Sequence, residues 1–292
     1  MNEKIGIVTV LYNCEDVLKD FFDTLSIQLY KNFELIVVDN SSKDNSLKVC
    51  KDLSKKVNFL CYFIENSDNK GIAGGNNQGI KLALEHNCDK VLLSNNDIIL
   101  QPDTIQQLYE AHITNDVALS VPKIFYAGTS KLWFAGGWYD KKKCMAYHIG
   151  MGNEDDGCYD EEKLITYSPT CFMLIDKEVF SLVGYMDEKY FVYWDDTDFV
   201  YRCLYKKNLK LLYCPKSTLQ HKVSYSTGDD SDFSAYYMMR NRIYFAKKNS
   251  LNPRAYFIIN LIYHYTIRYI KFLNKKKRWL LLGKAIKDGW KI

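Results

Sequence analysis

Four short apolar segments alternate with three amphipathic ones in the first hundred residues, and this alternation most constrains the fold. The apolar segments have the length and β-branched composition of buried parallel strands, whereas the amphipathic segments repeat their large apolar residues at helical spacing. The expected strands are residues 5–11, 33–38, 57–64 and 90–94, and the expected helices begin near Asn13, Asp44 and Asn77. The alternation predicts an α/β domain with a mostly parallel central sheet and helices on both faces.

Polar residues follow the second and the fourth expected strands. Asp39-Asn40 comes directly after the second strand, and Asn95-Asn96-Asp97 comes after the fourth. In open parallel sheets ligands bind beyond the carboxyl ends of the strands, so both groups are candidates for a binding site. Between them, residues 71–75 contain three glycines and predict a turn before the third helix.

The middle of the chain, from residue 121 to about 163, is less regular. A strand at 170–175 and a helix at 176–182 precede the densest group of reactive side chains, Tyr193-Trp194-Asp195-Asp196-Thr197-Asp198. A further strand at 209–214 is followed by His221. This acidic group is a second candidate site, about a hundred residues after the first.

Several classes of protein are excluded by missing motifs. A dinucleotide-binding domain needs G-x-G-x-x-G after the first strand, where this chain has Leu11-Tyr12-Asn13-Cys14, and no Gly-Lys-Ser/Thr element of a P-loop occurs. The nine cysteines are dispersed without a C-x-x-C pair, and the first residues lack a signal-peptide pattern. We therefore expect reduced thiols in a cytoplasmic protein and no thiolate zinc site.

The net charge of +4 conceals an uneven distribution. Residues 236–292 contain 14 Lys and Arg and one acid, Asp288, which gives +13, whereas residues 1–235 contain 25 Lys and Arg and 34 acids, which gives −9. The basic residues are interleaved with Trp, Tyr and Leu, as in a helix that lies among lipid headgroups. No apolar segment reaches the roughly 20 residues that a spanning helix needs.

The two candidate sites suit one reaction. A carboxylate at a strand end can hold a divalent cation that bridges phosphate oxygens. A separate carboxylate can serve as a general base. Glycosyl transfer from a nucleotide sugar requires both groups, because a diphosphate must leave while an acceptor hydroxyl loses its proton.

The order of motifs resembles family 2 glycosyltransferases with a GT-A fold, and most closely their rhamnosyltransferase-like subgroup. The resemblance covers about residues 5–226. Its motifs are Thr9-Val10-Leu11-Tyr12-Asn13, Glu34 to Asp44, Asn69 to Gly79, Ser94-Asn95-Asn96-Asp97, Trp194 to Phe199 with Arg202, and His221-Lys222-Val223. One such motif is weak evidence, but six in the same order are strong evidence.

The resemblance implies a nucleotide pocket and assigns residues to it. Asp39 would accept a hydrogen bond from the imide of uracil or thymine, and the glycines would let the chain pass close to the base and ribose. The implied pocket residues are Thr9, Tyr12, Asn13, Asp39, Asn40, Gly74, Gly75, Asn76, Asn95 and Asn96.

The resemblance also implies a metal site and a base. Asp97 would bind Mg²⁺ or Mn²⁺, with His221 as a further ligand, and Asp196 would deprotonate the acceptor while Asp195 orients it. Two departures matter. The metal motif has Asn at its first two positions, so metal binding should depend on the diphosphate. The acid pair is Asp-Asp rather than Glu-Asp, so either carboxylate remains a candidate base.

The expected organisation is a GT-A domain at 1–235, with a nucleotide-binding part at 1–120 and an acceptor-binding part at 121–235, followed by a basic amphipathic helical tail at 236–292. The implied enzyme is an inverting hexosyltransferase of class EC 2.4. It would move a sugar from a dTDP- or UDP-linked donor, with rhamnose as one candidate, to a glycan or lipid-linked acceptor in bacterial surface polysaccharide synthesis. We expect it at the cytoplasmic face of the membrane, without nucleic acid and with a homo-oligomer among its candidate partners.

Alternatives remain for each feature. The whole chain could be a non-catalytic sugar-nucleotide-binding or scaffold protein, or a nucleotidyltransferase. Asp39 could be a turn residue, and Asp195 to Asp198 could simply begin a helix. His221 taken singly is more often a structural histidine than a ligand, and only the motif before it makes the two interpretations about equal. The tail could be a helical extension packed on the body or on a partner subunit.

Overall fold

The computed structural model describes residues 3–222, 231–249, 254, 258 and 276–292. Its strands are β1 (Ile5–Leu11), β2 (Phe33–Asp39), β3 (Leu60–Glu65), β4 (Lys90–Ser94), β5 (Ile98–Leu100), β6 (Leu119–Tyr126), β7 (Leu132–Phe134), β8 (Gly137–Asp140), β9 (Met145–His148), β10 (Lys163–Leu164), β11 (Phe172–Asp176) and β12 (Leu211–His221).

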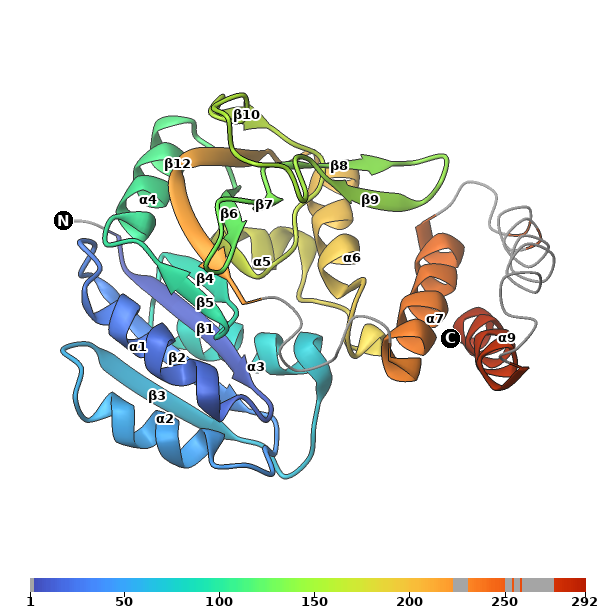
Figure 1. Cartoon of the computed structure of the whole chain (residues 1–292), viewed down its shortest axis with the longest axis horizontal. Helices are drawn as coiled ribbons and strands as arrows, with labels where there is room; N and C mark the ends of the chain where they lie inside the picture. The colour runs from blue at the N-terminus through green and yellow to red at the C-terminus, as the bar shows by residue number, and fades with distance from the viewer. Residues whose placement is uncertain (1–2, 223–230, 250–253, 255–257, 259–275) are drawn as a thin grey trace.

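The helices alternate with the first strands and then gather toward the C-terminus (Figure 1). The α-helices are α1 (Leu18–Ser26), α2 (Ser46–Ser54), α3 (Gly71–Glu85), α4 (Thr104–Thr114), α5 (Lys177–Val183), α6 (Asp195–Tyr201), α7 (Asp232–Asn249) and α9 (Lys276–Lys291). Short 3₁₀ turns, η1 (Glu15–Val17) and η2 (Glu188–Tyr190), and a π-helical segment, η3 (Arg202–Lys206), complete the described helical elements.

The main sheet runs in the order β10-β12-β6-β11-β4-β1-β2-β3, with β5 on β12 and β7 on β6. Strands β4, β1, β2 and β3 are parallel, and β12 is parallel to β6. Because the chain moves from β1 to β3 in one direction and then returns to β4, right-handed crossovers place α1 and α2 on one face and α3 on the other. The prediction of a mostly parallel α/β sheet with helices on both faces is confirmed.

Strand β11, in the middle of the sheet, is antiparallel to both of its neighbours, β4 and β6. Phe172 at its start pairs with Ser94 at the end of β4. The residues that precede β11 therefore reach the same edge of the sheet as the residues that follow β4. That edge holds the candidate site.

The predicted glycine-rich turn at 71–75 is wrong, because α3 already begins at Gly71. The glycines allow α3 to lie close against β1. A Cβ added at Gly79 would lie 2.3 Å from Cγ1 of Val8, and one at Gly75 would lie 2.8 Å from Cγ1 of Val10. Gly71 itself has φ of +74° and abuts the carbonyl of Phe191. Close helix–sheet packing therefore outweighs the roughly 1 kcal/mol that glycine costs inside a helix.

Asn13 does not cap the helix that follows β1. It has a φ of 51°, and its side-chain Oδ1 accepts a hydrogen bond from the backbone N–H of Lys43 at 2.7 Å. The side chain thus ties the β1 turn to the turn after β2, and the chain enters α1 through η1. A competing tertiary hydrogen bond, rather than local capping, fixes this residue.

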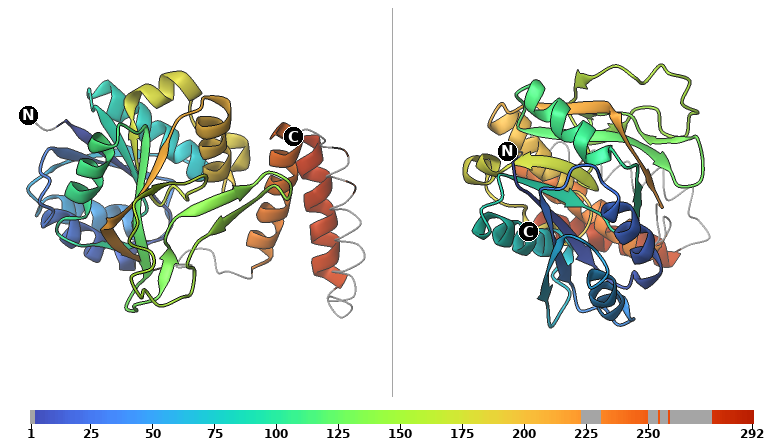
Figure 2. Two further views of the ribbon diagram at one scale, coloured as in Figure 1. Left: turned by 90° about the horizontal axis from the view of Figure 1, so that it is seen from above. Right: turned by 90° about the vertical axis from the view of Figure 1, so that its left-hand side faces the viewer.

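The described part of the tail is helical and packed. Met239 and Ile243 of α7 pack with Leu282, Ala285 and Ile286 of α9, and Figure 2 shows the two helices side by side at one end of the molecule. Helix α7 begins before residue 236, so it crosses the boundary expected between body and tail. The division of the chain into domains stays a prediction.

Helix α7 also packs on the body. Phe245 and Tyr244 join a cluster with Trp194, Tyr190, Tyr139 and Tyr167, and an N–H of Arg242 donates to the carbonyl of Lys143 in the β8–β9 hairpin, which reaches out toward α7 in Figure 2. Trp194 is therefore a core residue. Within the described residues, no helix combines the length and apolarity that crossing a membrane requires.

Candidate active site

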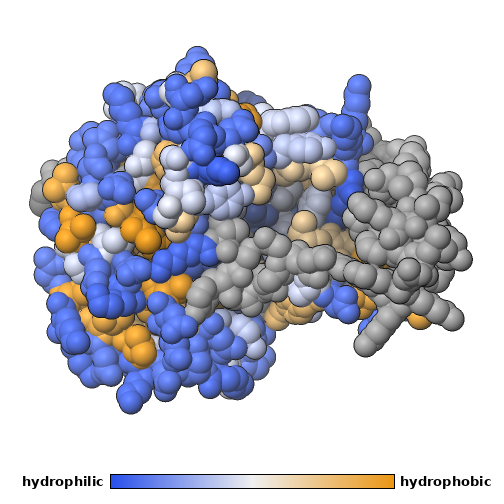
Figure 3. All heavy atoms as spheres, in the orientation of Figure 1, coloured by the Kyte–Doolittle hydropathy of each residue, from blue (hydrophilic) through white to orange (hydrophobic). Residues whose placement is uncertain are grey.

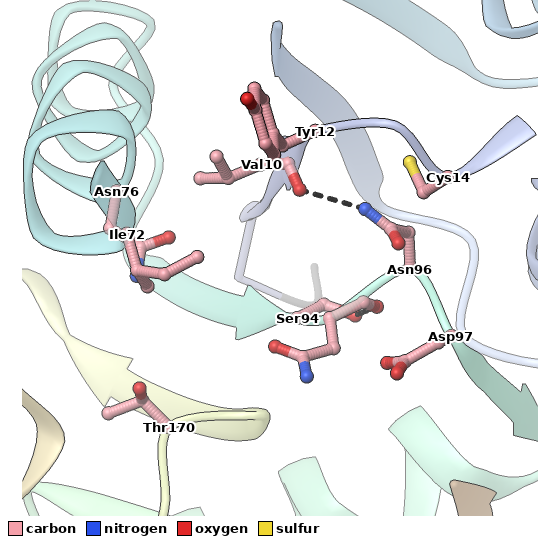
Figure 4. A pocket seen from close by; sticks show the side chains of 10 residues that line it. Val10, Tyr12, Cys14, Ile72, Asn76, Ser94, Asn96, Asp97 and Thr170 are labelled. Carbon is pink, nitrogen blue, oxygen red and sulfur yellow. Dashed lines mark hydrogen bonds between the residues drawn. The ribbon is translucent and has the colours of Figure 1, made fainter. Parts of the chain in front are cut away.

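A pocket opens at the carboxyl ends of β1 and β4, where the first candidate site is predicted. The side-chain amide of Asn96 donates to the carbonyl of Val10 at 2.8 Å and so joins the ends of the two strands (Figure 4). The start of α3 forms a second wall, and the turn before β11 forms a third. The lining residues are Val10, Tyr12, Cys14, Ile72, Asn76, Ser94, Asn95, Asn96, Asp97 and Thr170.

A second cavity of about 340 Å³ adjoins the first, because Tyr12 and Ile72 line both. It extends from the end of β2 toward the start of α7. Its remaining lining residues are Asn40, Asn69, Gly71, Phe191, Val192, Ser231 and Phe233. The two adjoining cavities, together called the hollow below, lie along the carboxyl edge of the sheet.

The predicted nucleotide residues divide into two groups. Six predicted site residues line these cavities, namely Tyr12, Asn40, Asn76, Asn95, Asn96 and Asp97. The other predicted nucleotide residues lie behind the cavity walls and hold them in place. Asn13 binds the β2 turn, Gly75 packs on Val10, and Gly74 faces Lys70 and Glu188. Thr9 is buried, and among the described residues its hydroxyl has no hydrogen-bond partner.

Asp39 and Asn40 end β2 in a network that reaches α3. The buried carboxylate of Asp39 accepts from the backbone N–H of Ser42 at 3.3 Å. The amide of Asn40 donates to the carbonyl of Gly71 at 2.9 Å, and its oxygen accepts from Asn66. Both residues therefore hold the wall of the second cavity, and Asn40 also faces into it.

The two predicted metal ligands, 124 residues apart in sequence, are in contact. Nε2 of His221 lies 3.0 Å from Oδ1 of Asp97, and the backbone N–H of Lys222 donates to the carbonyl of Asp97. Burial disfavours the charge of Asp97, but its hydrogen bond to His221 and the charge of that ring outweigh burial, so the pKa of Asp97 is below its ordinary value. The ring of His221 stands edge-on to Trp133.

These residues suit a divalent cation only in part. A carboxylate oxygen and an imidazole nitrogen are suitable ligands for Mn²⁺, and Nδ1 of His221 is buried without a hydrogen-bond partner among the described residues. Within that same part of the chain, no group of three or more His, Cys, Asp and Glu could hold a metal ion. A cation here would therefore need further ligands from a bound diphosphate and water.

The acid pair begins α6. Asp196 accepts hydrogen bonds from the hydroxyl of Tyr167 at 3.2 Å and from the backbone N–H and the hydroxyl of Thr197 at 2.5 and 3.1 Å. Burial raises the pKa of both Asp195 and Asp196, and the charge of Asp196 raises that of Asp195 further. Asp195 is buried and Asp196 is half-buried, and two adjacent carboxyls with raised pKa values tend to share one proton.

The charge of Asp198, two residues later, is instead neutralised by cationic side chains. Asp198 is fully buried, and it accepts from Nε of Arg202 at 2.8 Å and from Nζ of Lys248 at 3.0 Å. Lys248 belongs to α7, so an ion pair joins α6 to the tail. Asp198 anchors the helix, which leaves Asp195 and Asp196 as the acids without a cationic partner among these contacts.

The turn before β11 lies between the two acid centres. The thiol of Cys171 is buried, which raises its pKa, and the charges of both Asp97 and Asp196 raise it further. Thr170 lines the pocket, and Tyr167 binds Asp196. Sequence reasoning missed these three residues, since their segment matches no motif and owes its position to the pairing of β11 with β4.

Comparison with protein families agrees with this geometry. Residues 6–184, more than half of the chain, match the family described as "Glycosyl transferase family 2". The chain belongs to this family and is a glycosyltransferase of the hexosyltransferase class. The match ends before the acid pair of α6 and before His221.

Two curated relatives share most of this chain. It is 25% identical over 257 residues to the low-salt glycan biosynthesis hexosyltransferase Agl10 of Haloferax volcanii. The aligned region covers 87% of this chain and 78% of that protein. It is 28% identical over 213 residues to the dTDP-rhamnosyl transferase RfbF of Shigella flexneri. The aligned region covers 70% of this chain and 64% of that protein.

A solved structure shares the fold. The crystal structure of GalNAc-T7 with UDP, GalNAc and Mn²⁺ superposes with a TM-score of 0.65 at 14% identity, over 84% of this chain and 48% of that one. The likeness shows that the fold is GT-A, as predicted.

The raised pKa of Asp195 makes a prediction about stability. A folded-state pKa above the unfolded value of 3.8 means that the native protein holds a proton which the unfolded chain has released, so Asp195 lowers stability progressively as pH rises above that value. We expect Asp195→Asn to be more stable than the wild type at pH 8, by roughly 2 kcal/mol, and the difference to shrink toward pH 4. Urea unfolding at several pH values measures this.

Asp198→Asn is the matched control. It removes a carboxylate that two cations neutralise, so it should be destabilising at pH 8. If Asp195→Asn is destabilised as much as Asp198→Asn at pH 8, burial does not disfavour the charge of Asp195.

Proposed function

Because the chain is a family 2 glycosyltransferase, we propose that it is an inverting enzyme which transfers a hexose from a dTDP- or UDP-linked donor, with rhamnose among the candidate sugars. The acceptor is a glycan or a lipid-linked glycan in bacterial surface polysaccharide synthesis. The names of the two relatives support glycan synthesis as the process. The observation that carries the proposal is that the turn before β11 reaches two acid centres, since Thr170 lines the cavity that contains Asp97 and the hydroxyl of Tyr167 donates to Asp196.

The donor occupies the hollow at the carboxyl edge of the sheet. The nucleoside lies beside Tyr12 and Asn40, with Asp39 behind them, and the diphosphate lies toward Asn95, Asn96 and Asp97. Asp97 and His221 would hold Mg²⁺ or Mn²⁺, which when bound supplies positive charge that stabilises the departing diphosphate. The solved relative that binds UDP together with Mn²⁺ supports a divalent cation at this fold.

The acid pair acts on the acceptor. Asp196 is the general base, because Tyr167 and Thr197 hold its carboxylate in place and burial raises its pKa toward the pH at which a base is most effective. The acceptor hydroxyl gives its proton to Asp196, its oxygen forms a bond to the anomeric carbon, and the bond from that carbon to the diphosphate breaks. Asp195 retains the shared proton and can donate a hydrogen bond that orients the acceptor.

Replacement of the base should abolish transfer but spare the donor. We expect Asp196→Asn to lower turnover by about 10²–10⁴-fold while the affinity for UDP or dTDP changes little, because Asp196 touches the acceptor. The measurement is release of nucleoside diphosphate from a panel of UDP- and dTDP-sugars, with calorimetry for affinity. An inactive Asp195→Asn beside an active Asp196→Asn would reverse the assignment.

Cation binding should depend on the nucleotide. With Asp97 and His221 as its side-chain ligands, the protein alone should bind Mn²⁺ weakly and should bind it at least about tenfold more tightly when UDP or dTDP is present. Calorimetry with and without the nucleotide measures the difference, and His221→Ala should reduce it. Tight Mn²⁺ binding by the empty protein, or full activity in excess chelator, contradicts this proposal.

We further propose that the tail binds an anionic membrane surface at the cytoplasmic face. Most of the segment predicted to make this contact, residues 256–290, lies outside the described residues. In the described part, Lys284, Lys287 and Lys291 of α9 are exposed. On the face of the body drawn in Figure 3, hydrophobic side chains form groups among hydrophilic ones. The proposal rests on the charge of the tail. Each Lys or Arg near anionic headgroups contributes about 1 kcal/mol.

Liposome flotation tests the membrane proposal. The full chain should float with vesicles that contain phosphatidylserine, less so at high salt, and a chain truncated near Ser250 should not. Lys287→Glu with Lys291→Glu should weaken flotation while α9 stays packed, because both side chains point to solvent. Equal flotation of the full and truncated chains, or none by either, supports packing against a partner subunit instead.

A further inference from the structure

The loop that leads into the acid pair has an unusual backbone. Phe191, Tyr193 and Trp194 have φ angles of 66°, 63° and 68°, in the left-handed region that residues with bulky side chains rarely adopt. Asp195 and Asp196 follow directly, so the direction of α6 depends on this loop. A backbone of this kind persists only where surrounding contacts hold it.

Asn241 of α7 provides such contacts. Its side-chain nitrogen lies 2.8, 2.7 and 2.9 Å from the carbonyl oxygens of Tyr190, Val192 and Tyr193. A primary amide has two N–H bonds, so three carbonyl groups share them. Asn241 is 0% exposed, so in the folded protein water does not compete for these hydrogen bonds.

The neighbouring residue fixes the amide in this orientation. Nη1 of Arg240 donates to Oδ1 of Asn241 at 2.6 Å, which turns the nitrogen toward the loop, and Nη2 of Arg240 donates to the carbonyl of Lys189. On the other side of the loop, the carbonyl of Phe191 accepts from the backbone N–H of Ile72 at 2.7 Å. The loop is thus held between the start of α3 and the middle of α7.

We propose that Asn241 is a positioning residue for the acid pair. It keeps Phe191, Tyr193 and Trp194 in the left-handed conformation from which α6 presents Asp195 and Asp196 to the acceptor. The inference rests on the proposed role of Asp196 as the base. It assigns to α7 a part in catalysis that is separate from any contact of the tail with a membrane.

The test is Asn241→Asp in the full chain. Aspartate has nearly the same shape and keeps the contact with Arg240, but its carboxylate cannot donate to the three carbonyl groups. We expect kcat for hydrolysis of UDP-glucose, UDP-N-acetylglucosamine or dTDP-rhamnose, whichever the wild type turns over, to fall at least about tenfold. The KM for that donor and the affinity for its nucleoside diphosphate should change by a smaller factor than kcat, because Phe191 and Val192 of the loop line the cavity beside Asn40 but the cavity at the ends of β1 and β4 has no lining residue from the loop or from α7.

Ile243→Ala is the matched control. Ile243 is equally buried on the same helix, but it packs against α9. We expect this variant to lose stability and to keep kcat within about threefold of the wild type. A comparison of the two variants separates the loss of a hydrogen bond to the loop from general damage to α7.

A second variant covers the case in which Asn241→Asp does not fold. Glycine adopts positive φ without a steric penalty, so in a Tyr193→Gly background the loop should need less help from Asn241. We expect Asn241→Ala to lower kcat by a smaller factor in that background than in the wild type, which a double-mutant cycle measures.

Two outcomes overturn the inference alone while the wild type remains active. One is a folded Asn241→Asp that keeps kcat within threefold of Ile243→Ala, and the other is an Asn241→Ala effect of equal size in both backgrounds. A wild-type chain that turns over no sugar nucleotide contradicts the proposed function, and the inference with it.

Discussion

The antiparallel pairing of β11 with β4 is the interaction on which the candidate active site depends. Phe172 lies opposite Ser94, so the residues before β11 emerge where Asn95 to Asp97 leave the sheet. The backbone N–H of Asn95 donates to the carbonyl of Cys171 at 2.8 Å and closes this junction. A parallel strand in the same place would begin at the opposite edge, and Tyr167 would then lie a strand's length away from the carboxyl ends.

The three acids in the first turn of α6 have different electrostatic surroundings. Asp198 is buried with Arg202 and Lys248, so its charge stabilises the junction of α6 with α7. Asp195 and Asp196 have no such partners, and burial raises their pKa values. The charge of Asp198 therefore contributes to stability, whereas burial disfavours the ionised forms of the two acids that would act on the acceptor. Such an arrangement is typical of sites where function opposes stability.

The nucleotide half of the fold could be predicted because its signals are local. The periodicity of the first hundred residues locates β1, β2 and β4 to within one residue at each end, and the motif order suggests the partnership of Asp97 with His221. The features that could not be predicted depend on contacts between residues far apart in the sequence. Glycine-rich segments look alike whether the glycines serve a turn or close packing, so the start of α3 is predicted wrongly. Tyr167 and Asn241 carry no motif, and their partners lie 29 and about 50 residues away.

The hydrogen bonds from α7 to the loop at 190–194 also bear on the order of assembly. During synthesis the N-terminal strands and helices leave the ribosome first and can fold as a unit. Asn241, whose side-chain amide holds the loop at 190–194, is synthesised about fifty residues after that loop. Strands β1 to β4 can therefore form before the acid pair reaches its final position. The cavity beside Asn40, which Phe191, Val192 and Phe233 also line, is complete only once α7 has docked, so the same late contact completes the donor site and positions the acid pair.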